Sequence, residues 1–122
     1  MCVLVHLIYK GVCFIILIAV GSLNGETVDF HLGKSKKLYV YNVQDENYEF
    51  VETRIVDISD NDKHQGGKVL DVCNDCDVII TQQYGPKSKI KANKLNIKLV
   101  TNEGKVDDVL KQYIEHYKFM NE

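Results

Sequence analysis

The 122-residue sequence lacks several features that would assign it to a special class of protein. One proline and eight glycines leave no room for a low-complexity linker, and no internal repeat is present. Neither sign of charge is in excess, because 15 basic and 17 acidic residues give a net charge of −2. This balance does not favour general binding to nucleic acid or to anionic membranes. The residues that are present, 45% hydrophobic and 26% charged, predict one globular domain with an ordinary core.

No hydrophobic run is long enough to cross a membrane, although the first 20 residues are largely apolar. His6 and Lys10-Gly11 interrupt them, so that only Val12–Val20 is continuous, about half of the ~20 residues that a spanning helix needs. No basic residue precedes Lys10 and no good cleavage site follows the run, which argues against a secretory signal. We therefore expect a cytoplasmic protein. A membrane tether formed by residues 1–20 is the alternative.

The N-terminal segment is interpreted separately from the domain. We expect residues 1–13 to be an N-terminal extension and residues 14–122 to form the domain. Lys10-Gly11-Val12 is what a purine-rich bacterial ribosome-binding site would encode if it were translated, so we hypothesise that the extension lies upstream of the natural start. Mass spectrometry of the native N-terminal peptide tests this hypothesis, because a peptide that begins at Met1 or Cys2 would contradict it.

Hydrophobic patterning predicts an α/β domain. Phe14–Val20 is a continuous apolar run rich in β-branched residues, typical of a central strand that is covered on both faces. Two alternating runs, 38–43 and 48–56, flank a turn-rich tetrapeptide and predict an antiparallel hairpin. There follow in order a helix near 68–73, a strand at 77–81, a helix that begins at Gly85-Pro86, a strand at 97–100 and a helix from 106. This order predicts three layers, with helices on both faces of a mostly parallel sheet that contains one antiparallel strand.

The candidate site lies in residues 25–35, between the central strand and the hairpin. A glycine-punctuated loop at the end of a buried strand holds His31 there, so its imidazole can point outward as a ligand for a metal or a metal cluster. His64, beside Gln65-Gly66-Gly67 at a helix entrance, is the second candidate. For both residues the alternative is a polar loop histidine that binds nothing.

The four cysteines are expected to be reduced, because a chain of this size and hydrophobicity does not need a disulfide framework. They are Cys2, Cys13, Cys73 and Cys76. The last two form a CxxC motif at the expected C-terminal end of a helix, where the helix dipole disfavours a thiolate. No second CxxC supplies the further ligands of a structural zinc site. Structural thiols are therefore favoured over a cluster or redox role, which stays open.

The residue patterns of common enzymes are missing. Gly33-Lys34-Ser35 has the appearance of the end of a phosphate-binding loop, but Val28 stands where that loop needs its first glycine. The central strand has no carboxylate for two-metal phosphoryl chemistry, and no serine, cysteine and histidine stand at recognisable catalytic spacing. The lysines from Lys87 to Lys98 form either a basic face for an anionic ligand or a solvated helix surface. We expect a binding protein rather than an enzyme.

Taken in order, these residues resemble the dinitrogenase iron–molybdenum cofactor biosynthesis family from about Ile15 to Tyr117. The landmarks are ILIAVGS, Asn24-Gly25, Val28–Lys34, the hairpin LYVYNV…YEFVETR, His64–Gly67, Asp75–Ile80, Gly85-Pro86 and the helix after Gly104. The resemblance implies a ribonuclease-H-like α/β fold with a five-stranded mixed sheet and without catalytic carboxylates.

The same resemblance implies a role in nitrogen fixation, as a non-catalytic carrier for an iron–sulfur or iron–molybdenum-type cluster. Loop histidines would hold the cluster for transfer to or from a partner, which is a cluster donor or acceptor protein. The histidine tied to cofactor binding carries over to His31, with Leu32 in place of the usual phenylalanine, and His64 is a second ligand. Gly33 and Gly85 would lie at the rim. A metal-free regulatory or protein-interaction domain of the same fold is the alternative.

Overall fold

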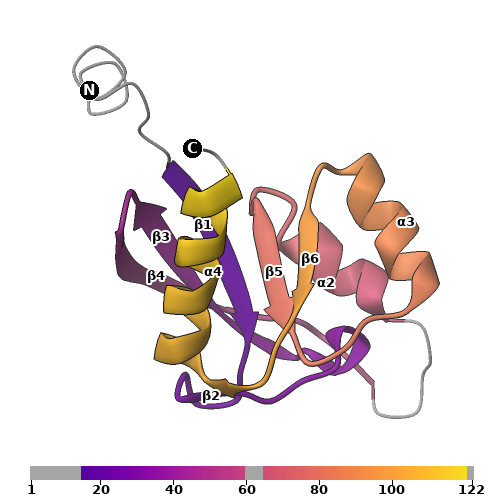
Figure 1. Ribbon diagram of the computed structural model, residues 1–122. Coiled ribbons are helices and arrows are strands. Elements are labelled where there is room, and N and C mark those ends of the chain that lie inside the picture. The colour runs from indigo at the N-terminus through magenta and orange to yellow at the C-terminus, as the bar shows by residue number, and fades with distance from the viewer. Residues whose placement is uncertain (1–14, 60–64, 121–122) are drawn as a thin grey trace.

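The computed structural model describes residues 15–59 and 65–120. Its main sheet has five strands, whose arrangement Figure 1 shows. The strands lie in the order β4-β3-β1-β5-β6. Their bounds are β1 Ile15–Gly21, β3 Lys37–Gln44, β4 Asn47–Ile55, β5 Val78–Thr81 and β6 Lys98–Thr101. β3 runs antiparallel to both of its neighbours, whereas β1 pairs parallel with β5 and β5 with β6. The predicted mixed sheet is confirmed, while residues 1–13, the predicted extension, lie outside the described residues.

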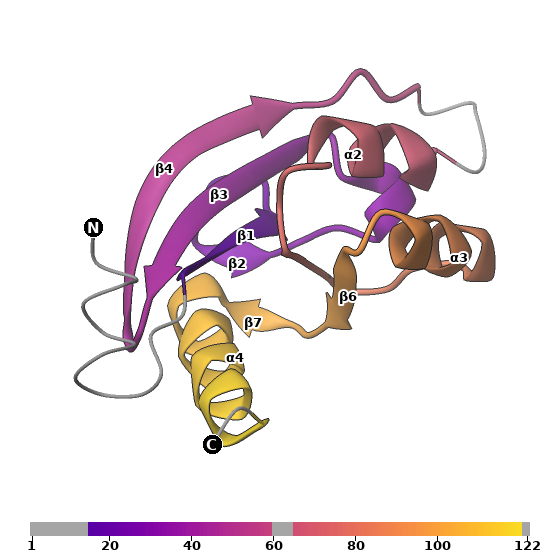
Figure 2. The same ribbon diagram turned by 90° about the horizontal axis from the view of Figure 1, so that it is seen from above.

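Helices cover both faces of this sheet, as the order of the elements predicts (Figures 1 and 2). α2, Gly66–Val72, and α3, Pro86–Lys94, pack on one face, and α4, Val106–Met120, packs on the other. Neighbouring residues of β1 contribute to different sides of the core, because Ile18 packs with α4 whereas Ala19 packs with α2 and α3. Both residues are fully buried, which explains why the sequence of β1 is apolar without alternation.

Local signals set where the helices begin. Pro86 is the first residue of α3, where its missing N–H leaves no hydrogen bond unmade, and Gly85 is the N-cap. Asp107 and Asp108 lie in the first turn of α4, where the positive end of the helix dipole stabilises carboxylates.

The two helices differ in how many side chains they bury in the core. α4 contributes five buried residues to the core, whereas α3 contributes only Ala92.

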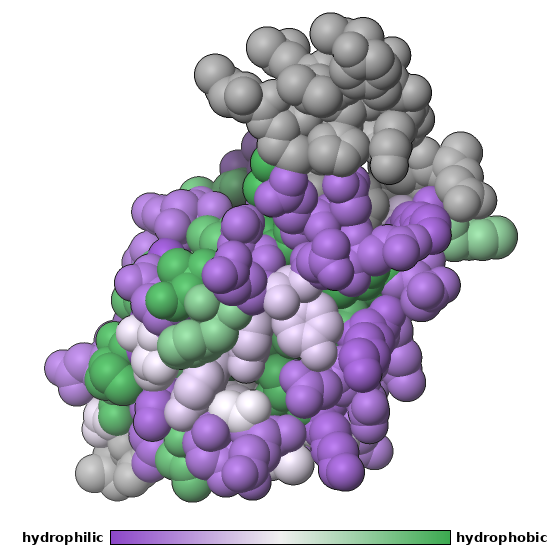
Figure 3. All heavy atoms as spheres, turned by 90° about the vertical axis from the view of Figure 1, so that its left-hand side faces the viewer, coloured by the Kyte–Doolittle hydropathy of each residue, from purple (hydrophilic) through white to green (hydrophobic). Residues whose placement is uncertain are grey.

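The hairpin leaves β4 at an edge of the sheet. Its turn contains Asp45 with φ of 56°, in the left-handed region that aspartate tolerates better than most residues. The register shifts between Val40 and Tyr41, which marks a β-bulge. Phe50 and Ile55 of β4 are each more than half exposed. Figure 3 faces this side of the molecule and shows apolar surface interspersed with polar surface. A bulge and interspersed charges are features that discourage edge-to-edge association.

Three short elements, two of them within residues 25–35, are not foreseen from the sequence. β2, Thr27–Val28, pairs antiparallel with β7, Gly104–Lys105, and η1, Leu32–Lys34, is a 3-10 helix. Strands of two residues are too short to show alternation, so no periodicity reveals them. They tie the stretch to the start of α4, where the N–H of Val106 donates to the carbonyl oxygen of Glu26 at 2.9 Å. Within 15–59 and 65–120, no helix is long and apolar enough to cross a membrane.

Candidate functional site

His31 lies beyond the carboxyl end of β5, beside the chain that continues this strand. The N–H of Leu32 donates to the carbonyl oxygen of Gln83 at 2.7 Å, and the N–H of Gln82 donates to that of Phe30 at 2.8 Å. His31 and Gln83 thereby pair as an isolated parallel bridge. Ligands of open α/β sheets bind outside the carboxyl ends of parallel strands, so His31 stands where such a site is expected.

The imidazole of His31 is exposed and caps η1. The N–H of Gly33 donates to Nδ1 of His31 at 3.2 Å. An accepting Nδ1 carries no proton, so in the neutral ring the proton is on Nε2. Coordination of a metal by this neutral ring therefore requires His31 to give up the bond to Gly33, by rotation or by moving its proton. Such a hydrogen bond contributes about 0.5–1.5 kcal/mol, so the exchange between capping and coordination costs little.

A pocket of about 730 Å³ lies beside His31. Three segments that are far apart in the sequence line it: the η1 turn and the N-terminal parts of α2 and α3. The lining residues are His31, Gly33, Lys34, Gly66, Gly67, Gly85, Pro86, Lys87, Ser88 and Lys91. The volume falls within the range of roughly 300–1,000 Å³ that is usual for small-molecule and cofactor sites.

One glycine marks a close approach between two of these segments. A Cβ on Gly66 would lie 2.2 Å from Oγ of Ser88 and 3.3 Å from its Cβ, so a side chain at Gly66 would require Ser88 to shift. A Cβ on Gly33 would lie 3.5 Å from the backbone nitrogen of Gly66, which is ordinary contact. A Cβ on Gly85 would meet no atom within 4 Å. Gly85 therefore contributes as the N-cap of α3 and not through close packing.

The pocket is positively charged. Lys34, Lys87 and Lys91 line it, and among the residues that the structure describes none that lines it is acidic. Lys91 is partly neutralised, because its Nζ lies 2.7 Å from Oδ1 of Asp71 outside the lining. Across the described ranges, no group of three His, Cys, Asp or Glu side chains gathers that could hold a metal ion. One imidazole among ammonium groups is a poor site for a bare divalent cation, but it suits an anionic cluster that carries its own sulfur ligands.

Three of the four predicted site residues come together at this pocket: His31, Gly33 and Gly85. The fourth, His64, lies outside the described residues. Sequence reasoning missed Lys34 as a lining residue. The clustered lysines of α3 are visible as a pattern, but Lys34 is far from them in the sequence, and the fold alone places it on the same pocket.

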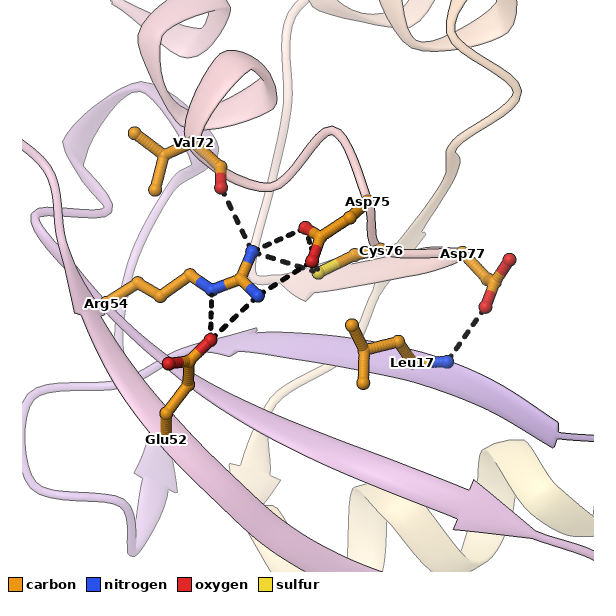
Figure 4. Close-up of polar contacts among 7 residues, drawn as sticks. All are labelled: Leu17, Glu52, Arg54, Val72, Asp75, Cys76 and Asp77. Atoms are coloured by element: carbon orange, nitrogen blue, oxygen red, sulfur yellow. Dashed lines mark hydrogen bonds and ion pairs between the residues drawn. The ribbon is translucent and has the colours of Figure 1, made fainter.

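The two cysteines of the CxxC motif lie away from the pocket. Cys73 and Cys76 are free thiols, buried in the core between the sheet and α2. Arg54 of β4 reaches the turn that they flank (Figure 4). Its guanidinium donates to the two carboxylate oxygens of Asp75 at 2.5 and 2.9 Å, and its Nη1 lies 3.8 Å from Sγ of Cys76.

These contacts make the two thiols unequal. The hydrogen bond between them lowers the pKa of Cys73 and raises the pKa of Cys76, and burial raises the latter further. Arg54 acts against the helix dipole here, because its positive charge favours the thiolate of Cys73. Full burial is consistent with structural thiols, and that assignment stays a prediction.

Comparison with a family model decides the relationship of this chain to known proteins. The model described as dinitrogenase iron-molybdenum cofactor matches residues 15–116. The chain belongs to the dinitrogenase iron–molybdenum cofactor family. The matched range includes every residue that lines the pocket, so the family domain contains the whole candidate site. The resemblance predicted from the sequence is confirmed, and it associates the chain with the iron–molybdenum cofactor of nitrogen fixation.

Two crystal structures share the fold of this family member. PH0822 superposes with a TM-score of 0.69 at 22% identity, over 82% of this chain and 89% of PH0822. A protein of Methanocaldococcus jannaschii that is described as a dinitrogenase by inference superposes with a TM-score of 0.59 at 20% identity. The match covers 84% of this chain and 91% of that protein. At these identities the likeness shows the α/β fold alone. No curated protein matches the sequence.

Proposed function

We propose that this protein is a non-catalytic carrier, which holds an iron–sulfur or iron–molybdenum-type cluster beside His31 for transfer to or from a partner protein. The composition of the pocket carries the proposal: its described lining has an exposed imidazole, three lysines and no acidic side chain. Such a lining suits a cluster that arrives assembled and negatively charged. Membership of the family supports the choice of cargo.

The same geometry suits release of the cargo. His31 gives up its hydrogen bond from Gly33 when it coordinates the cluster, and it recovers that bond when the cluster leaves. Few protein ligands, placed on an exposed turn, hold a cargo less tightly than a closed metal site does. His64 remains our proposed second ligand.

Retention of the cluster by the purified protein tests the proposal. The protein is purified anaerobically, mixed with isolated iron–molybdenum cofactor and desalted, and its visible spectrum is compared with that of His31→Ala. We expect the wild type to keep the chromophore and the variant to lose most of it. His116→Ala is the matched control, because His116 is an exposed histidine of α4, on the opposite face of the sheet. Equal retention by His31→Ala would refute the ligand role.

A metal-free regulatory or protein-interaction domain is the second candidate. The hydrogen bond from Gly33 favours it, because that bond gives His31 a structural task without any ligand. If neither the wild type nor the control variant retains colour, this candidate replaces the carrier.

A further inference from the structure

Helix α3 carries charge of one sign. Residues 78–102 contain five lysines and no acidic residue, which leaves ten basic and 17 acidic residues in the rest of the chain. Four of the five lysines belong to α3: Lys87, Lys89, Lys91 and Lys94. The protein therefore presents a basic helix on an otherwise acidic chain, and such an asymmetry steers partners of opposite charge.

Contacts within the protein use only part of this charge. Lys91 pairs with Asp71, and Nζ of Lys89 lies 5.7 Å from the centre of the Tyr84 ring. By contrast, Lys87 and Lys94 form no ion pair with the part of the chain that the structure describes. These two ammonium groups are therefore available to another molecule.

An apolar side chain lies between the two available lysines. Ile90 is 58% exposed, and the spacing of three and four residues places it on the same helix face as Lys87 and Lys94. The core does not require this face, because Ala92 is the buried residue of α3. Lys87, Ile90 and Lys94 together form a mixed basic and apolar stripe, which we call the α3 stripe.

We propose that the α3 stripe docks an acidic surface of another protein, whose carboxylates meet Lys87 and Lys94 and whose apolar side chain packs on Ile90. The stripe begins at the pocket, because Lys87 also lines it, so the docked protein would lie at the pocket rim. The inference extends the proposed function, since it names the class of partner that exchanges the cluster.

Other anionic partners fit this stripe less well. An extended nucleic acid would meet the 17 acidic residues that lie outside 78–102, and α3 has no aromatic side chain on which a base could stack. An anionic membrane would find one isoleucine between the two lysines, which is too little apolar surface for stable insertion. A compact acidic protein avoids both difficulties, because it contacts the stripe alone.

An NMR titration of the isotope-labelled apoprotein tests the inference. The titrant is a helical peptide of glutamate and alanine that carries two leucines one turn apart. We expect the shifted amides to cluster on α3, and the same peptide without leucine to bind more weakly. Ile90→Ser/Lys94→Gln should weaken binding of the leucine peptide about fivefold to tenfold. Lys105→Gln/Lys111→Gln, which removes two exposed lysines elsewhere and so one positive charge more, is the charge control and should bind as the wild type does.

The outcomes separate docking from cargo binding, because Ile90 and Lys94 do not line the pocket. If Ile90→Ser/Lys94→Gln still retains the cluster but binds the peptide less well, both proposals stand. If the wild type retains the cluster but the peptide shifts amide signals near lysines all over the protein, the docking proposal is wrong and the carrier proposal survives. Tighter binding of single-stranded DNA or of phosphatidylglycerol vesicles than of the peptide would overturn the assignment to an acidic protein. Self-association through the stripe would overturn it in favour of a second copy.

Discussion

One guanidinium holds the outer strand of the hairpin to the turn that follows α2. Arg54 donates from Nε to Glu52 at 2.9 Å, from Nη1 to the carbonyl oxygen of Val72 at 3.0 Å, and from both terminal nitrogens to Asp75 (Figure 4). The side chain of Arg54 is 16% exposed, whereas that of Asp75 is 53% exposed, so water screens this ion pair. The hydrogen bonds from Arg54 hold the pKa of Asp75 below its usual value.

Asp75→Asn is expected to lower the free energy of unfolding by about 0.5–1 kcal/mol at neutral pH, the range for partly exposed pairs. Because the pKa of Asp75 is lowered in the folded protein, its carboxylate stabilises the fold above the ordinary pKa of about 4. That contribution disappears as pH falls through the folded value. Urea unfolding of wild type and variant should therefore converge at low pH. Asp57→Asn removes an exposed carboxylate that forms no ion pair with described residues, and should show little effect at either pH. If the difference in the free energy of unfolding between wild type and Asp75→Asn stays the same at every pH, the ion pair with Arg54 does not stabilise the fold.

At the scale of elements, α3 and α4 contribute unequally to the fold. Leu110 of α4 is fully buried, whereas Ile90 of α3 is exposed. We expect Leu110→Ala to cost about 3 kcal/mol in the free energy of unfolding, and Ile90→Ala to change it by less than about 0.5 kcal/mol. Urea unfolding of the two variants measures the contrast. A comparable loss in Ile90→Ala would mean that the α3 stripe supports the fold and is not free for a partner.

Glycines with positive φ occur both in the turn before β2 and in its partner strand β7, and they resist substitution for different reasons. Gly25 has φ of +83°, and a Cβ there would lie 2.7 Å from the ring of Tyr39. Gly104 has φ of +104°, but a Cβ there would meet nothing within 4 Å. We expect Gly25→Ala to cost about 2–3 kcal/mol, from backbone strain and the clash together, and Gly104→Ala to cost about 1 kcal/mol, from strain alone. Thermal unfolding of both variants tests the difference, and equal losses would show that the Tyr39 contact is relieved without cost.

Elements with a full hydrophobic period were predictable, and elements without one were not. The five main strands, α2 and α4 each show a pattern over several residues, as β1 does with its apolar run and α4 with its repeating apolar face. α3 has no such face, and Gly85-Pro86 at its start is the signal that predicts it. β2 and β7 have two residues each, and pairing between distant segments alone creates them. The same limit applies to the site. His31 and its glycines stand out in the sequence, whereas Lys34 joins the lysines of α3 only through the fold.

At the scale of the whole molecule, the charge at the pocket is positive although the net charge of the chain is negative. The net charge is −2, yet the pocket lining within 15–59 and 65–120 has three lysines and no acidic side chain. Sheet topology causes the difference, because it brings the η1 turn, α2 and α3 together beyond the carboxyl ends of the parallel strands. An anionic cargo therefore meets a positive potential at the site despite the acidic chain.

Salt should separate this local field from direct coordination. Lys34→Gln/Lys87→Gln is expected to shorten retention of the iron–molybdenum cofactor several-fold at low salt, because two ammonium groups leave the pocket. Raising the salt from about 0.1 M to about 1 M cuts the screening length from about 10 Å to about 3 Å, so retention by the wild type should fall toward that of the variant. Lys105→Gln/Lys111→Gln changes the net charge equally without touching the pocket. If this control loses the cofactor as fast as Lys34→Gln/Lys87→Gln does, the net charge of the protein governs retention. If the difference between wild type and pocket variant persists in high salt, the lysines contact the cargo directly.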